Sequence, residues 1–202
     1  MELPLFELVI ADNDEGTAEV NCISFVKRPA IEKNFLAFSS NEENNKQKFS
    51  ILSDEKKIVA GAVMLADVPI YRKDNERGEY YVVFNKDTIE TIAQRFFKRG
   101  YQSNVNTNHS DKVDGVTFYQ SFIYNKELGI QPMKGFEDVP EGSWFVVAKV
   151  DNEDLWNQVK SEEFKGFSVE GIFGMKELSM QEELNTDEII LNEIINILKE
   201  VK

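Results

Sequence analysis

Two residue types that can build a hydrolytic site occur far apart in this 202-residue chain. Ser168 lies between glycines in the stretch 165–171, which otherwise has the composition of a buried strand, and His109 is the chain's only histidine. A serine hydroxyl becomes a nucleophile when a neighbouring base with a pKa near neutrality removes its proton, and histidine is the ordinary base for that purpose. Since the chain has one histidine, His109 is the candidate base for Ser168.

A serine site usually has a third group that orients the base, and two carboxylates are candidates. Strand residues two apart share a face, so Glu170 would point the same way as Ser168, and Asp111 has the same spacing from His109. The glycines at both ends of 165–171 would let backbone N–H groups approach a developing oxyanion closely. The residues alone leave another interpretation open, in which Ser168 is an ordinary strand hydroxyl and His109 an ordinary loop residue of an acidic, β-rich domain.

The composition excludes several other functions. With 36 acidic and 23 basic residues the net charge is −13, which disfavours direct binding to nucleic acid or to an anionic membrane. Cys22 is the only cysteine, so we expect no internal disulfide and no zinc site built from Cys and His. The mostly apolar segment 58–70 is shorter than the ~20 residues of a spanning helix, and residues 1–4 do not resemble a signal peptide, so we expect an intracellular protein.

The elements that would position these residues are mainly strands. Residues 4–10 and 18–26 are predicted to form a hairpin around the turn-like segment 12–16, and strands are also expected at 35–38, 49–52, 58–65, 70–72, 80–84, 116–124 and 144–150. Strands at this spacing predict a barrel or a sandwich. Apolar periodicity predicts helices over 87–99 and 151–163, and the second leads directly into the Ser168 strand.

The last segment, 185–202, carries apolar residues at helical spacing behind an N-cap pattern formed by Asn185 and Glu188. We therefore expect an amphipathic C-terminal helix after a main domain of residues 1–184. This helix would dock either on its own domain or in a groove of another subunit or scaffold.

The order of short motifs along nearly the whole chain resembles the phage serine proteases of the XkdF-like type, relatives of the prohead (capsid maturation) proteases. The motifs that carry the resemblance are Ile23–Val26 leading to Arg28–Glu32, Phe35–Phe38, Gly61–Met64 leading to Pro69–Arg72, Asn108–Ser110, Gly142–Trp144, Trp156–Lys160 and Gly166–Gly171.

This resemblance implies a β-rich α+β fold, with a herpesvirus-assemblin-like β-barrel flanked by helices. Residue by residue, His109 matches the family's histidine and Ser168 its serine. Relatives often have an acidic residue where this chain has Gln120, so the third group is assigned to Glu170 first and to Asp111 second.

The implied function is that of a serine endopeptidase acting inside the phage prohead, in the host cytoplasm. Its substrates would be the scaffolding protein, the N-terminal extension of the major capsid protein, or both, and no metal or organic cofactor would be needed. Because assemblin-like proteases are activated by dimerisation, a homodimer is implied, with residues 185–202 as a candidate contact. The alternative is a weakly active or inactive structural component of the phage head on the same fold.

Overall fold

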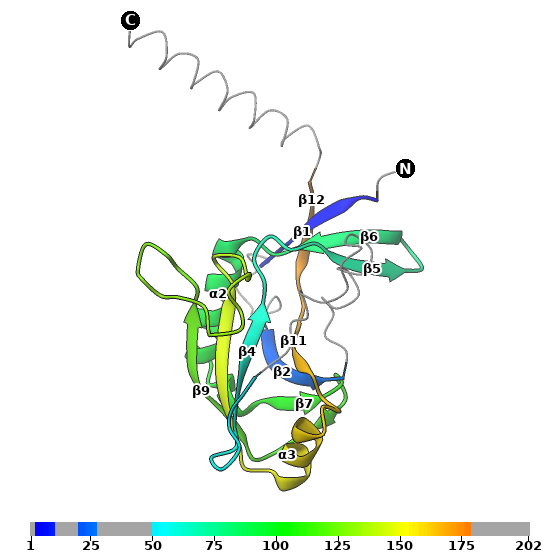
Figure 1. The fold of residues 1–202 in the computed structure, drawn as a ribbon. Helices are drawn as coiled ribbons and strands as arrows, with labels where there is room; N and C mark the ends of the chain where they lie inside the picture. The colour runs from blue at the N-terminus through cyan, green and yellow to red at the C-terminus, as the bar shows by residue number, and fades with distance from the viewer. Residues whose placement is uncertain (1–2, 11–19, 28–49, 179–202) are drawn as a thin grey trace, which may run out of the picture.

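The computed structural model describes residues 3–10, 20–27 and 50–178, and these form three four-stranded sheets with two α-helices (Figure 1). The first sheet has the order β12 (Gly174–Leu178), β1 (Leu5–Val9), β6 (Gly78–Val83) and β5 (Ile70–Asp74). The second has the order β3 (Ser50–Ser53), β4 (Ile58–Met64), β10 (Trp144–Val150) and β9 (Val116–Ile123). The third has the order β11 (Gly166–Gly171), β2 (Val20–Val26), β7 (Val105–Thr107) and β8 (Asp111–Lys112).

The predicted β-rich α+β class is confirmed, whereas the strand pairings of the described ranges show no closed barrel. The predicted strand at 35–38, the C-terminal helix at 185–202 and the boundary after residue 184 lie outside the described residues. The predicted barrel and C-terminal helix therefore stay predictions.

The predicted hairpin of the first two strands is wrong. β1 pairs with β12 and runs parallel to β6, while β2 pairs with β11 and runs parallel to β7. The two strands thus belong to different sheets, although both were correctly predicted as strands. The chain changes sheet again between β11 and β12, which follow each other closely along the ribbon in Figure 1.

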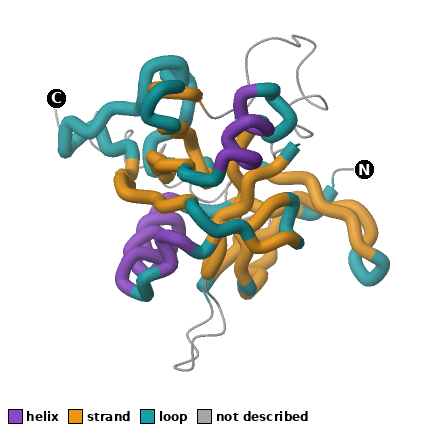
Figure 2. Tube along the Cα trace, turned by 90° about the horizontal axis from the view of Figure 1, so that it is seen from below, coloured by secondary structure: helices purple, strands orange, loops and turns teal. Residues whose placement is uncertain are grey.

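The two helices form where the sequence predicts them, and they lie on different sides of the strands (Figure 2). α2 (Lys86–Lys98) begins at Asn85, whose side chain accepts a hydrogen bond from the Thr88 N–H at 2.7 Å, and it buries one apolar stripe. α3 (Glu153–Lys160) is capped by Asn152, which accepts from the Leu155 N–H at 2.9 Å. This helix therefore begins two residues after the predicted start at 151 and ends three residues before the predicted end at 163. No helix in the described part of the chain is both long and apolar enough to cross a membrane.

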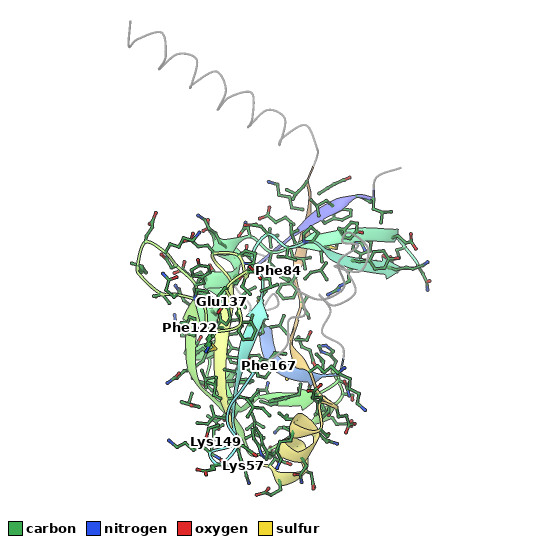
Figure 3. The ribbon with its side chains drawn as sticks, in the orientation of Figure 1. Lys57, Phe84, Phe122, Glu137, Lys149 and Phe167 are labelled. Carbon is green, nitrogen blue, oxygen red and sulfur yellow. The ribbon has the colours of Figure 1, made fainter. Side chains whose placement is uncertain are left out.

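The core is one cluster of buried side chains from all three sheets and both helices, and it is rich in aromatic residues. Trp144 on β10 contacts Phe96 of α2 edge-on, with ring centroids 5.5 Å apart. Phe167 of β11, labelled in Figure 3, makes T-shaped contacts with Phe25 at 5.1 Å and with Phe118 at 5.6 Å. Phe167 thus anchors the strand that carries Ser168 to the core.

The Gly142–Trp144 motif is explained by packing. Gly142 has φ 90°, and a Cβ atom there would lie 2.5 Å from Cβ of Lys86, so only glycine fits this turn. Next to it, the fully buried Ser143 accepts a hydrogen bond from the Ala66 N–H at 3.1 Å. These residues tie the start of β10 to the end of β4 and the start of α2.

Candidate active site

The register of the third sheet brings Ser168 and Glu170 to the same face as residues of β2 and β7. Ser168 lies opposite Ser24, and Ser24 lies opposite Asn106, so these three residues form one row across the sheet. Glu170 lies opposite Cys22, two residues along. Residues that face each other across a strand pair point to the same side, so all five share one face. We call them, together with His109, the polar cluster.

Three side chains of the polar cluster form a closed triangle of hydrogen bonds. Ser24 Oγ donates to Glu170 Oε1 at 2.8 Å, His109 Nδ1 lies 2.9 Å from the same oxygen, and Ser24 Oγ lies 3.1 Å from His109 Nδ1. Residues from β2, from the turn after β7 and from β11 therefore meet at one carboxylate oxygen.

Asn106 adds a further donor to the same oxygen. Its Nδ2 group donates to Glu170 Oε1, while its own Oδ1 is buried with no partner among the described residues. The Asn106 side chain lies on the buried side of the polar cluster, since the residue is 9% exposed. Glu170 Oε1 thus receives hydrogen bonds from Asn106 and Ser24 and contacts His109.

His109 reaches the polar cluster from a tight turn between β7 and β8. Asn108 and His109 have φ values of 47° and 61°, and the Ser110 N–H donates to the Thr107 carbonyl at 3.0 Å. Two successive positive φ angles belong to the hairpin turn of type I′, and Asn and His tolerate them better than most residues. The Asn108 N–H also donates to the Phe25 carbonyl at 2.9 Å, which ties the turn to β2.

Hydrogen bonding keeps Glu170 ionised despite its partial burial. Burial raises the pKa of this carboxyl, but the hydrogen bonds from Asn106, Ser24 and His109, with the charge of a protonated His109, outweigh it and lower the pKa below 4.5. The Cys22 thiol nearby behaves differently. Burial, and then the negative charge of Glu170, raise the pKa of Cys22 to about 11, so this residue is a neutral thiol.

The ionised carboxylate fixes the proton on the imidazole ring. A carboxylate can only accept hydrogen bonds, so at a separation of 2.9 Å His109 Nδ1 must carry a proton. In the neutral ring Nε2 is then the bare nitrogen, able to accept a proton. The His109 side chain is 42% exposed, so the ring is accessible from solvent.

The candidate residues differ in their burial and in their contacts with His109. Ser168 is half-buried on β11, and no described residue forms a hydrogen bond with its hydroxyl. Asp111 is exposed on β8, where it accepts a hydrogen bond from Ser110, and only Glu170 of the two carboxylates contacts His109 in the described structure. Gln120 is exposed on β9, in the second sheet.

Sequence reasoning did not assign a role to Ser24 or Asn106. Ser24 belongs to the Ile23–Val26 motif, and Asn106 belongs to none of the motifs. The available signal was a serine at the centre of the apolar strand 20–26, since a buried hydroxyl needs a partner. Within the described ranges no group of three or more His, Cys, Asp or Glu side chains could hold a metal ion.

Comparisons with known proteins identify a matching family and one relative. The family described as "Putative phage serine protease XkdF" matches residues 46–177, well over half of the chain. The uncharacterized protein YqbD of Bacillus subtilis (strain 168) is 28% identical over 158 residues, which are 76% of this chain and 44% of that protein. The chain thus spans less than half the length of this relative. No solved structure matches the chain significantly.

Proposed function

Because this chain belongs to the XkdF family of phage serine proteases, we propose that it is a serine endopeptidase whose nucleophile is Ser168 and whose base is His109. Glu170 orients the imidazole. The substrates are the scaffolding protein, the N-terminal extension of the major capsid protein, or both, cleaved inside the prohead in the host cytoplasm during head maturation.

The contact between His109 Nδ1 and Glu170 Oε1 supports this proposal most directly. It gives a neutral His109 a bare Nε2, which is the nitrogen that a general base uses. Ser168 precedes Glu170 by two residues on the same strand face and lies opposite Ser24, which itself contacts the ring. Cβ atoms of directly opposed strand residues lie about 5 Å apart, so Ser168 lies one strand spacing from a residue that contacts the base.

The reaction proceeds through an acyl-enzyme. Ser168 Oγ attacks the scissile carbonyl carbon while His109 Nε2 takes the hydroxyl proton, and the resulting imidazolium returns that proton to the leaving amine as the peptide bond breaks. Water then attacks the ester with His109 again as base, releasing the new carboxyl terminus and restoring Ser168. The Glu170 carboxylate stabilises the imidazolium in both steps.

The main test is the loss of cleavage in Ser168→Ala. Co-expression with the capsid and scaffolding proteins should yield cleaved products with the wild-type chain and none with Ser168→Ala, and a fluorophosphonate probe should label only the wild type. Ser161→Ala is the matched control, because the Ser161 hydroxyl lies at the end of α3 and donates to the Gln158 carbonyl. Identical cleavage by wild type and Ser168→Ala would remove Ser168 from the mechanism.

The homodimer is tested separately. Deleting residues 185–202 should lower the mass measured by light scattering from that of a dimer to that of a monomer. An unchanged mass would remove this segment from the dimer contact without affecting the assignment of Ser168.

A second candidate function is that of a structural head component without protease activity. The observation in its favour is that the described residues include no hydrogen bond between Ser168 and His109. Under this alternative the wild-type chain is not labelled by the fluorophosphonate probe at any stage of assembly, yet heads fail to form when the chain is absent.

A further inference from the structure

We propose that Ser24 and Asn106 are positioning residues, which hold the Glu170 carboxylate against His109 Nδ1 and so fix the imidazole tautomer. Their effect on cleavage rests on the function proposed above. Their effect on the histidine does not, because it is a property of the hydrogen-bonded cluster itself.

The two opposed serines of the sheet differ in burial and in partners. Ser24 is fully buried and donates to Glu170 Oε1, whereas Ser168 is half-buried on β11 and has no such bond in the described structure. A hydroxyl with no exposed surface cannot meet the carbonyl carbon of a polypeptide substrate. Ser24 therefore acts on other side chains, and Ser168 is the hydroxyl of the pair that can reach a substrate.

Two buried residues, Ser24 on β2 and Asn106 on β7, donate hydrogen bonds to the Glu170 carboxylate. Asn106 and Ser24 both donate to Glu170 Oε1, the same oxygen that contacts His109. Because Glu170 is a flexible side chain at a partly exposed position, contact with His109 alone would leave it several rotamers. Hydrogen bonds from buried groups on two neighbouring strands select one of them.

The same donors favour the charged form of the carboxyl group. A neutral Glu170 could donate its proton to His109 Nδ1, which would then accept and leave Nε2 protonated in the neutral ring. Ser24 and Asn106 oppose this because their donors need an acceptor at Oε1. Losing either donor should therefore let the carboxylate leave His109 Nδ1 for part of the time, and the two imidazole tautomers should then mix.

The sole histidine makes this testable without a substrate. Long-range ¹H–¹⁵N correlation spectra should show one imidazole, with Nδ1 protonated in the neutral wild-type ring. Ser24→Ala and Asn106→Ala should each move both nitrogen shifts toward a mixture of tautomers. Ser24→Thr, which keeps the hydroxyl, should restore the wild-type pattern.

Labelling by the fluorophosphonate probe gives the second readout. Ser24→Ala should react about tenfold more slowly than wild type, since a hydrogen bond to a charged group is lost. The matched control is Ser143→Ala, which also removes the hydroxyl of a fully buried serine, but one that accepts from Ala66 outside the polar cluster. This control should change neither the spectrum nor, once folded, the labelling rate.

The outcomes separate the two proposals. Unchanged nitrogen shifts in both Ser24→Ala and Asn106→Ala would overturn the positioning role, as would equal slowing of labelling in Ser24→Ala and Ser143→Ala. Shifted spectra in a chain whose wild type is never labelled would support the positioning role and overturn the protease function.

Discussion

The sheet formed by β11, β2 and β7 has an aromatic face that packs in the core and a polar face that carries the site residues. On one face Phe167 and Phe25 pack edge-on with ring centroids 5.1 Å apart, and both are almost fully buried. On the other face the neighbours Ser168 and Ser24 lie opposite each other beside Glu170. Strand alternation therefore places every site residue of β11 and β2 directly next to a core residue.

This difference shows how a small protein can position a site on strands. The aromatic face fixes the backbones, because close-packed rings tolerate little displacement. The polar face then needs only short side chains to complete its hydrogen bonds. His109 is the exception, since it comes from a turn, and that turn is tied to β2 by the bond from the Asn108 N–H to the Phe25 carbonyl.

Glu170→Gln should give the largest effect on the polar face. The amide keeps an acceptor oxygen but loses the charge that holds the proton on His109 Nδ1, so labelling by a fluorophosphonate should fall about 10³-fold. Glu163→Gln is the control, because the exposed Glu163 side chain forms an ion pair with Lys27 at 2.7 Å, away from the polar cluster. A wild-type labelling rate in Glu170→Gln would break the link between this face and catalysis.

Phe167→Ala tests the core face. Removing a buried aromatic ring that contacts Phe25 and Phe118 should lower the free energy of unfolding by about 3–5 kcal/mol, measured by urea denaturation. Its neighbour provides the comparison, since Ser168→Ala should change stability by no more than about 0.5 kcal/mol. Similar losses in the two variants would mean that the faces do not divide structure from chemistry.

Much of this arrangement could be predicted from local sequence. Apolar spacing predicted the helix over 87–99, and strand alternation in 166–171 placed Ser168 and Glu170 on one face. The partners of that face could not be found in this way. Ser24 and Asn106 are separated from Glu170 by much of the chain, and a pairing between distant strands leaves no local periodicity.

The wrong hairpin has the same cause. Segments 4–10 and 18–26 both have strand composition around a turn-like sequence, which normally indicates antiparallel neighbours. Each strand instead pairs with a partner that comes much later in the chain, β12 and β11 respectively. Tertiary packing decided the topology.

A smaller effect is expected on the alkylation rate of Cys22, which lies on the polar face. Because burial and the nearby Glu170 charge raise its pKa to about 11, the thiolate fraction at neutral pH is very small. Alkylation by iodoacetamide should be about a hundredfold slower in the native chain than in urea, measured by mass spectrometry. Glu170→Gln should speed the native reaction a few-fold by removing the charge, and equal rates in native and denatured protein would contradict the buried position.

Lowering the pH should produce the smallest change in the free energy of unfolding, because it protonates Glu170. Its pKa is lowered in the folded chain, so its contribution to stability is complete above about pH 4.5 and is lost as the pH falls through the folded value. The difference in unfolding free energy between wild type and Glu170→Gln should therefore shrink as the pH falls below about 4.5, measured by urea titration at each pH. A difference that stays constant would mean that Ser24, Asn106 and His109 do not favour the carboxylate, and the polar face would then lack the charge on which its chemistry depends.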